Sequence, residues 1–340
     1  MESSREETKS TTNHHPAVHH STGQPGERAR GRQTKVMIPS GEASVTLNFG
    51  GRELRLTNLL KKFWPALGVT KGDLLRYYLS VSKELLPHLA GRAMVMKRYP
   101  NGIDGDFFFM KRAPSPRPDW IDVCAIKHSS GNVIDFPIIA DVPSLLWVVN
   151  LGCIDLNQWY ARCDDVDRPD YLHFDLDPVG EINFKRVIEG ALLIREYLET
   201  VGIHSYAKTS GSRGIHIYVP IVRGPLQHQV WSFAKEFSLA AAARKPKLLT
   251  AEYKKNRRPV GRVLVDYNQN AWGRTLASVY SVRPTPVASV STPVSWEELE
   301  QGLRTEDFRI DNVAGRISKF GDLWKPMLAA RGRFRLEKYL

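Results

Sequence analysis

The sequence predicts an α+β fold in one folded region, residues 36–340, which follows an N-terminal tail over residues 1–35. Two observations support this prediction. Stretches in which apolar and polar residues alternate, as in half-buried strands, are interspersed with longer segments of helical periodicity. In addition, 42% of the 340 residues are apolar, which is enough for one large domain or for two modest ones that share a cleft.

The tail over residues 1–35 contains almost no apolar side chains. Such a segment cannot bury enough surface to offset the entropy that it loses on ordering, so we expect it to be disordered. Its clustered histidines could bind a metal ion, but a disordered basic tail is the favoured interpretation. These histidines are His14, His15, His19 and His20.

The chain is strongly basic. Its net charge is +12 at pH 7 and its pI is about 9.6, with charged residues spread along the body as well as the tail. This balance indicates a polyanionic partner, foremost nucleic acid. An anionic membrane surface is the alternative. The sequence has neither a long apolar run nor a basic amphipathic helix, so no membrane partner is expected.

The cysteines Cys124, Cys153 and Cys163 form no C-x-x-C pair. Neither a zinc site nor a disulfide framework is therefore expected, and the favoured interpretation is reduced thiols in the core. The N-terminus also lacks the apolar segment of a signal peptide. We therefore expect a cytoplasmic, nucleoid-associated protein.

The folded region begins with strand patterns at residues 36–38 and 43–47. Thr70 is a good N-cap for a helix over residues 71–85. Lys61 and Lys71 bracket the loop that leads to this helix. A helix N-terminus with nearby lysines is a good seat for a phosphate group, although two solvated surface lysines would give the same pattern.

An aromatic triplet, Phe107, Phe108 and Phe109, follows a strand pattern over residues 92–98 and is flanked by basic residues. Aromatic rings beside basic residues are suited to stacking on unpaired bases, which contributes about 1–3 kcal/mol per base. Because side chains alternate along a strand, we expect at least one ring to face the core and another to be exposed.

Helices and strands alternate through the rest of the chain. Helical patterns occur at residues 142–150, 184–198 and 227–243, and strand patterns at residues 171–178, 205–209, 215–220 and 263–267. A short helix and a covering strand are expected within residues 296–327. The residues that most clearly suggest chemistry here are the acids on these strands and a Ser/Gly loop between two of them.

Asp175 and Asp177 alternate with apolar residues in one strand, so both carboxylates point to the same face. Their Cβ atoms are expected to lie about 6–7 Å apart. Two like charges this close are costly unless a cation lies between them, and a pair of divalent metals that holds phosphate oxygens is the usual occupant. A solvated strand end is the alternative. Asp266, at the end of the strand over residues 263–267, is the natural third carboxylate.

A Ser/Gly loop over residues 210–214, with Arg213 in it, joins two of the predicted strands. Such a loop exposes backbone N–H groups and can hold a triphosphate. Ordinary turns have the same composition, so this pattern alone is weak. A basic run over residues 245–262 precedes the strand that carries Asp266 and adds to the anion-binding character of the region.

Three motifs in this order resemble the bacterial primase-polymerase family: Asp-Leu-Asp-Pro at residues 175–178, Thr-Ser-Gly-Ser-Arg-Gly-Ile-His-Ile at 209–217 and Val-Leu-Val-Asp-Tyr-Asn-Gln-Asn at 263–270. This family belongs to the archaeo-eukaryotic primase (AEP) superfamily, and its best-known bacterial members are the polymerase domains of the end-joining ligase D. The resemblance covers about residues 56–323. It implies an α+β catalytic core in which two mixed α/β lobes surround a central cleft, with an RRM-like palm lobe that carries all three acids.

The resemblance also implies roles for individual residues. Two divalent metal ions, Mn²⁺ or Mg²⁺, would be held by Asp175, Asp177 and Asp266. The nucleotide would be bound by Lys97, Ser210, Arg213, His216, Gln269 and Arg283. A 5′-phosphate at the downstream edge of a gap or break would be held by Asn58, Lys61 and Lys71. The template would be contacted by Phe108 and Phe109, through stacking, and by Arg258.

The sequence departs from the family pattern at two places. Family members usually carry Leu-His-Pro-Trp at residues 156–159, so Asn157 replaces a histidine that helps at the active site. One extra residue, Pro259 or Val260, follows Arg258, which affects the template contact. The sequence given shows no ligase or nuclease motif, so we expect similarity to the stand-alone polymerases that partner the separate ligase C.

The implied function is that of a DNA-repair polymerase that adds nucleotides, preferentially ribonucleotides, to primer 3′ ends at short gaps or breaks by two-metal nucleotidyl transfer. Expected partners are gapped or broken double-stranded DNA with a 5′-phosphate, NTP or dNTP, and a separate ATP-dependent DNA ligase. The alternatives are an end-joining polymerase, a primase that needs no primer, and a nucleic-acid-binding module with an inactive site. Lys61 and Lys71 favour gap filling, because such a pair needs a 5′-phosphate to hold.

Overall fold

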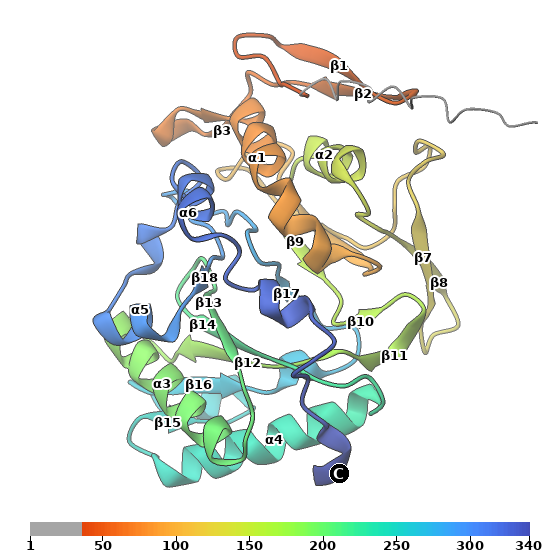
Figure 1. Ribbon diagram of the computed structural model, residues 1–340. Helices are drawn as coiled ribbons and strands as arrows, with labels where there is room; N and C mark the ends of the chain where they lie inside the picture. Colours follow the sequence, from red (N-terminus) through yellow and green to blue (C-terminus); the bar gives the residue numbers. More distant parts are fainter. Residues whose placement is uncertain (1–35) are drawn as a thin grey trace, which may run out of the picture. The chain divides into compact units, whose positions relative to one another are not determined.

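The computed structural model describes residues 36–340. The tail over residues 1–35, with its expected disorder and its four histidines, lies outside the described residues. Two β-sheets organise the described part, and each forms the framework of one lobe (Figure 1). The six α-helices of this part are α1 (Lys71–Leu89), α2 (Val142–Asn150), α3 (Phe184–Thr200), α4 (Gln227–Arg244), α5 (Trp296–Gln301) and α6 (Val313–Phe320).

The first lobe contains a four-stranded antiparallel sheet with the strand order β17-β9-β5-β6. Its strands are β5 (Met94–Arg98), β6 (Phe108–Met110), β9 (Cys153–Gln158) and β17 (Leu276–Ala277). Helices α1 and α2 pack against each other above this sheet (Figure 1). The lobe therefore draws most of its residues from the N-terminal half of the chain and a single strand from the C-terminal half.

Three two-stranded hairpins complete the first lobe. They are formed by β1 (Ser44–Phe49) with β2 (Arg52–Thr57), by β3 (Lys62–Trp64) with β4 (Val69–Thr70), and by β7 (Val123–Lys127) with β8 (Val133–Pro137). The strand predicted at residues 36–38 is not formed. Its residues find no pairing partner, although the Ile38 side chain is buried.

Helix α1 begins where the sequence predicts. The Thr70 hydroxyl accepts a hydrogen bond from the Asp73 N–H, and the Asp73 carboxylate accepts one from the Thr70 N–H, so both orphan donors are satisfied in a capping box. The helix continues to Leu89, about one turn beyond the predicted end. Leu85 and Leu89, four residues apart, remain fully buried and extend its apolar side.

The second lobe has the expected RRM-like topology. Its sheet has the order β15-β16-β12-β14-β13-β18. The inner four strands, β12 (Tyr171–Pro178), β13 (Tyr206–Thr209), β14 (Ile215–Pro220) and β16 (Val263–Asp266), pair antiparallel in the order β16-β12-β14-β13. With α3 after β12 and α4 after β14, this is the split βαβ arrangement. The short edge strands are β15 (Leu249–Thr250) and β18 (Pro293–Val294).

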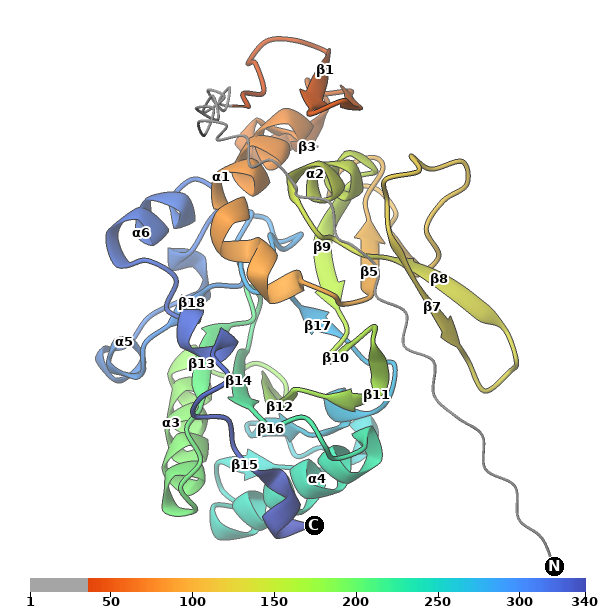
Figure 2. The ribbon, with the colours of Figure 1, turned by 45° about the vertical axis from the view of Figure 1, so that its right-hand side comes forward.

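The two faces of β12 have different surroundings. Leu172, Phe174 and Leu176 are fully buried, and the Phe174 ring lies 4.8 Å from that of Phe237 on α4. Helices α3 and α4 cover this apolar face and lie on the side of the sheet away from the first lobe (Figures 1 and 2). Because side chains alternate, Asp175 and Asp177 lie on the opposite face, which is turned towards the first lobe.

The C-terminal segment differs from the prediction. Residues 296–327 form two helices, α5 and α6, and contain no covering strand. Helix α6 forms because Val313 and Ile317, one helical turn apart, are both buried on the same side. Across residues 36–340, no helix has the length and apolar character needed to cross a membrane.

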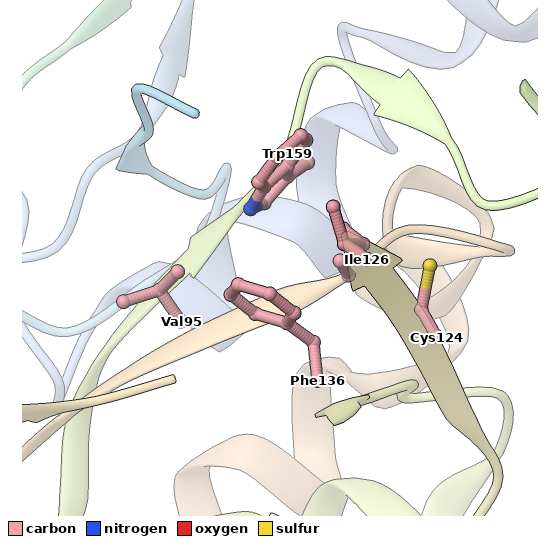
Figure 3. Close-up of a cluster of buried hydrophobic side chains, with 6 residues drawn as sticks. Val95, Cys124, Ile126, Phe136 and Trp159 are labelled. Carbon is pink, nitrogen blue, oxygen red and sulfur yellow. The ribbon is translucent and has the colours of Figure 1, made fainter. Parts of the chain in front are cut away.

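A buried cluster connects β5 with the β7–β8 hairpin (Figure 3). It includes Val95, Phe136 and Trp159, and Cys124 lies at its edge. Cys124 forms a disulfide with Cys163, at a Cα–Cα distance of 5.7 Å. The prediction of reduced thiols is therefore wrong for this pair, which lies 39 residues apart and has no local motif. Cys153 is a free, buried thiol, as predicted.

Candidate active site

Asp175 lies at the centre of the candidate site. Within the sheet it faces Asp266 of β16 on one side and His216 of β14 on the other. Burial, and then the charge of Asp266, raise the pKa of the Asp175 carboxyl to about 7. The charge of Asp175, and then burial, raise the pKa of Asp177 to about 8. The three carboxyl groups are therefore close enough to repel one another.

This donor set suits a hard divalent cation. Carboxylate oxygens are the ligands that Mg²⁺ and Mn²⁺ prefer, and the buried Asp175 Oδ1 makes no hydrogen bond. Asp266 is partly engaged: its Oδ1 accepts from the Asn268 N–H at 2.8 Å, and its Oδ2 lies 3.4 Å from the amide nitrogen of Gln269. Within residues 36–340, no three His, Cys, Asp or Glu side chains form a ready-made metal centre, so the carboxylates would have to close around an ion.

The Ser/Gly loop connects β13 to β14 beside these acids. The Ser210 hydroxyl oxygen accepts hydrogen bonds from the Ser212 N–H at 3.1 Å and from the Gly214 N–H at 2.9 Å. Two of the N–H groups expected to face a triphosphate are thus satisfied within the loop itself. The Arg213 guanidinium donates to the Gly180 carbonyl and so joins the loop to the turn after β12.

Gly214 fits closely against the strand that carries the acids. A Cβ atom at this position would overlap the Leu176 carbonyl oxygen and would lie 2.8 Å from Asp177 Oδ1. Real Cβ atoms do not approach other atoms this closely, so the contact requires glycine. The loop and the acid-bearing strand are therefore in direct contact at the edge of the site.

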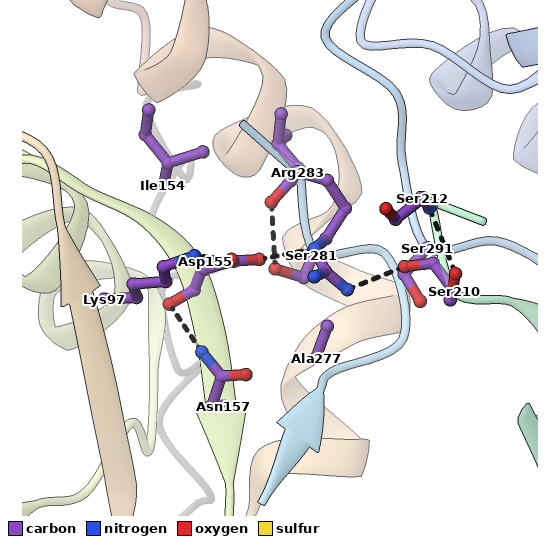
Figure 4. A network of polar contacts seen from close by, with 12 residues as sticks. Lys97, Ile154, Asp155, Asn157, Ser210, Ser212, Ala277, Ser281, Arg283 and Ser291 are labelled. Atoms are coloured by element: carbon purple, nitrogen blue, oxygen red, sulfur yellow. Dashed lines mark hydrogen bonds and ion pairs between the residues drawn. The ribbon is translucent and has the colours of Figure 1, made fainter. Parts of the chain in front are cut away.

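A polar network joins the two lobes at the site (Figure 4). Its centre is Asp155 of β9, whose side chain is almost fully buried. Asp155 Oδ1 lies 2.8 Å from Arg283 Nε, and Asp155 Oδ2 lies 3.7 Å from Lys97 Nζ. Arg283 also donates to the Ser210 carbonyl at 2.7 Å. The structure thus links three predicted nucleotide-binding residues: Lys97 and Arg283 contact one carboxylate, and Ser210 is joined to it through Arg283.

Asp155 was not among the predicted site residues, although a signal for it exists. It precedes Asn157 by two residues in β9, where both alternate with the apolar residues Ile154 and Leu156, so the same alternation that identifies Asp175 and Asp177 places Asp155 and Asn157 on one face. In the structure the Asn157 side-chain amide donates to the Asp155 backbone carbonyl at 3.2 Å. Asn157 therefore supports the network at the position where the family usually has a histidine.

A second residue that was missed is Lys208, on β13. Its ammonium nitrogen lies 2.7 Å from His216 Nδ1, and His216 Nε2 lies 3.2 Å from Asp175 Oδ1. Burial is the main cause that lowers the pKa of Lys208 and that of His216 well below their ordinary values. His216, expected to face the nucleotide, is thus held between a buried lysine and a candidate metal ligand.

The residues predicted to hold a 5′-phosphate come together at the N-terminus of α1. The Lys71 N–H donates to the Lys61 carbonyl, and the Lys61 N–H donates to the Asn58 carbonyl. Burial, and then the charge of Lys61, lower the pKa of Lys71 to about 8. The Lys71 ammonium donates to the Thr57 carbonyl at 2.7 Å, so it would have to turn outward to reach a phosphate.

Phe108 and Phe109 of the aromatic triplet lie on β6, an edge strand of the first sheet, and Phe107 directly precedes it. Phe107, Phe108 and Phe109 are 51%, 44% and 61% exposed, so the expectation that one of them faces the core is wrong. The triplet lies at the edge of the sheet, where Lys97 and Arg98 contact its rings but leave them partly open to solvent. Phe109 pairs with Lys97 across the sheet, whereas Phe108 pairs with Arg98. The two rings predicted to stack on template bases therefore lie on opposite faces.

Arg258 lies at the mouth of the site. It lines a pocket of about 470 Å³ together with Lys255, Arg213 and Asp177, and Val260 forms part of the rim. The Arg258 guanidinium is anchored by the Glu252 carbonyl, at 3.1 Å. The extra residue near position 260 thus shapes this basic pocket rather than removing Arg258 from it.

Comparison with known proteins identifies the family. Residues 70–324 match the family model of the LigD primase-polymerase domain. The chain belongs to this family. The multifunctional non-homologous end joining protein LigD of Mycolicibacterium smegmatis is 33% identical over 277 residues, which is 81% of this chain and 36% of the relative. The bifunctional LigD of Bacillus subtilis is 31% identical over 271 residues, 79% of this chain and 43% of the relative. The chain thus spans less than half the length of these relatives.

A solved structure agrees with this assignment. The polymerase domain of Mycobacterium tuberculosis ligase D, in complex with DNA, is similar with a TM-score of 0.76 and 30% identity, over 81% of this chain and 98% of that one. The resemblance to ligase D polymerase domains, the α+β core and the enzyme class of this primase-polymerase domain, a nucleotidyltransferase, are therefore confirmed.

Proposed function

We propose that this primase-polymerase is a DNA-repair polymerase that adds nucleotides to primer 3′ ends at short gaps or breaks. The observation that carries the proposal is the placement of the acids of β12 and β16, which face the Lys97–Asp155–Arg283 network across the two lobes. Carboxylates on one side and cations on the other are what the reaction of a nucleoside triphosphate with a 3′-hydroxyl requires.

In this proposal Asp175, Asp177 and Asp266 hold two divalent cations, preferentially Mn²⁺. When bound, these ions lower the pKa of the primer hydroxyl and neutralise the leaving pyrophosphate. The residues of the chain position the substrates: Lys97 and Arg283 offer positive charge to the triphosphate, while Ser210, Arg213, His216 and Gln269 surround it. Little covalent work falls to side chains, so positioning and charge dominate catalysis.

The DNA contacts follow from surfaces around the site. The net charge of +12 favours a polyanion, and the similar ligase D domain was solved in complex with DNA. Exposed Phe108 and Phe109 stack on template bases, and Arg258 contacts the template from the basic pocket. Asn58, Lys61 and Lys71 hold the 5′-phosphate of the downstream strand, which makes gapped or broken duplexes the preferred substrates.

End joining is the second candidate role, and the printed names of the relatives favour it. Ribonucleotide preference, a separate ATP-dependent ligase as partner and association with the nucleoid belong to the proposal as well. Extension on three substrates separates the roles: a one-nucleotide gap, a break with complementary overhangs and a single strand without a primer. These are compared at the same salt concentration, with NTPs and with dNTPs.

Greatest activity on the 5′-phosphorylated gap supports gap repair, and greatest activity on the paired break supports end joining. Synthesis on the unprimed strand would instead indicate a primase. Absence of extension on all three, with Mn²⁺ and Mg²⁺ both supplied, would contradict the polymerase proposal and favour a binding module.

A further inference from the structure

Lys208 is a buried lysine that the proposed catalytic roles leave unexplained. Its side chain is 0% exposed, and on β13 it lies directly opposite His216 of β14. A lysine is rarely buried completely, because its ammonium group loses its hydration. Its presence beside His216 therefore calls for a compensating set of hydrogen bonds.

Each hydrogen-bond position of the Lys208 nitrogen has a protein partner. Its nitrogen lies 2.9 Å from the Ala277 carbonyl oxygen and 2.5 Å from Ser291 Oγ. The carbonyl can only accept, and the Ser291 hydroxyl already donates to the Thr209 carbonyl, so its oxygen accepts from Lys208. Two hydrogens of the lysine are thereby committed, and the third position of its nitrogen is directed at His216 Nδ1.

This arrangement fixes the orientation of the His216 ring. The lysine nitrogen and His216 Nδ1 share a hydrogen bond of 2.7 Å. Because this bond engages Nδ1 whichever of the two nitrogens donates, Nδ1 is not available to a substrate. The other ring nitrogen, Nε2, then faces Asp175, at 3.2 Å from Oδ1. Ala277 belongs to β17, in the sheet of the first lobe, so the same lysine also ties His216 to the opposite lobe.

We propose that Lys208 is a positioning residue that acts through His216 and presents its Nε2 to the acid face and to the triphosphate bound there. The inference rests on the proposed nucleotide site and deepens it. Lys208 itself contacts no substrate in this arrangement, because its three hydrogen-bond positions are filled by protein atoms.

Lys208→Met removes the polar head with little change in length. We expect the KM for the nucleotide to rise on the order of tenfold, with a smaller change in kcat, as a lost hydrogen bond to a charged or strongly polar group would give. Lys185→Met makes the same substitution at an exposed lysine at the start of α3 and serves as the control, with KM unchanged.

A double-mutant cycle separates positioning from a merely structural role. In a His216→Ala background, Lys208→Met should leave the KM unchanged, because the residue through which it acts is gone. A similar increase in KM in both backgrounds would overturn the proposal. Should Lys208→Met fail to fold, Ser291→Ala loosens the same nitrogen with a smaller change, and the same cycle applies to it.

A spectroscopic arm does not depend on activity. In protein labelled with ¹⁵N-histidine, the His216 ring signals are assigned by their loss in His216→Ala. Lys208→Met should shift the Nδ1 signal while Lys185→Met leaves it in place. An unchanged Nδ1 signal would contradict the Lys208–His216 bond, even if wild type extends no primer and the proposed function itself fails.

Discussion

Arg283 Nε lies 2.8 Å from Asp155 Oδ1, and the same guanidinium donates to the Ser210 carbonyl. One buried carboxylate of the first lobe thereby sets the position of a cation that also holds the Ser/Gly loop of the second lobe. The nearby Lys97 leaves the group with a net positive charge. In the proposed function, a triphosphate that enters the site meets cations that are already oriented, which lowers the cost of binding it.

Asp155→Asn should raise the KM for the nucleotide on the order of tenfold, because Arg283 loses the charged partner that orients it. The measurement is steady-state primer extension, with a thermal melt to verify folding. Asp135→Asn is a matched control, since Asp135 pairs with Arg112 at an exposed site. If positive charge alone mattered, the variant would bind the triphosphate more tightly, and that result would refute the positioning role.

Asp175→Ala and Asp177→Ala should each abolish synthesis while DNA binding stays near normal. Removal of an acid lowers the negative charge of the site, so binding should not weaken through repulsion. Primer extension and a binding titration on the same gapped substrate check this. Asp311→Ala, at an exposed acid, should behave as wild type. Extension at a few per cent of wild type in both acid variants would disprove the metal assignment.

The raised pKa values of Asp175 and Asp177, about 7 and about 8, predict how metal binding depends on pH. Both exceed the ordinary value of about 4, so the folded protein without metal takes up protons there. The contribution of these two groups to the free energy of unfolding is therefore fully present below about pH 4 and is lost as the pH rises through about 8. A cation displaces the protons, so the increase in Tm on adding Mn²⁺ should be larger at pH 8.5 than at pH 6. An equal increase at both would count against this pair as ligands.

The two exposed rings of β6, Phe108 and Phe109, should contribute separately to template binding. Phe108→Ala and Phe109→Ala should each weaken binding to a gapped template, by about 1–3 kcal/mol per stacked base lost, with no early melting because both rings are exposed. Phe320→Ala, a 52% exposed ring on α6, is the control. Because Phe109 shares its face with Lys97, only its loss should also raise the KM for the nucleotide. Early unfolding of either variant would mean that the ring has a packing role.

The proposed 5′-phosphate site at Lys61 and Lys71 gives the sharpest test of gap filling. Wild type should fill a short gap faster when the downstream strand is 5′-phosphorylated, and Lys61→Ala with Lys71→Ala should erase the difference while open primer-templates are still extended. The salt slope of binding should fall by about 0.7–0.9 per lost contact. Lys62→Ala, whose ammonium is bound to the Gly68 carbonyl, should retain the preference. Equal rates for wild type on the two gaps would remove the pocket.

Binding of the 5′-phosphate at this proposed site should depend on pH. The pKa of Lys71 is lowered to about 8 by burial and by the charge of Lys61, so its ammonium loses its proton as the pH rises through this value. The advantage of the phosphorylated gap should therefore shrink between pH 7 and pH 9. Lys71→Arg, which stays charged over this range, should keep the advantage. A preference that does not change with pH in wild type would exclude Lys71 as a phosphate ligand.

The sequence predicts the acid strand and the order of the RRM-like lobe because both depend on alternation along single strands. Asp175 and Asp177 share a face whatever the rest of the chain does. Lys208 could not be found in this way: its partners Ala277 and Ser291 lie 69 and 83 residues further along the chain. The Cys124–Cys163 disulfide and the exposure of all three rings of β6 likewise depend on which segments lie next to one another, and no local pattern records that.

Gly214 has no functional group, yet its contact with Leu176 and Asp177 makes the spacing between loop and acid strand a fixed quantity. Any side chain at this position would act as a spacer that moves the nucleotide loop away from the acid or turns the Asp177 carboxylate aside. The geometry of the proposed active site therefore depends on the absence of a methyl group at Gly214 as well as on the carboxylates, and Gly214→Ala should disturb it although every charged residue is kept.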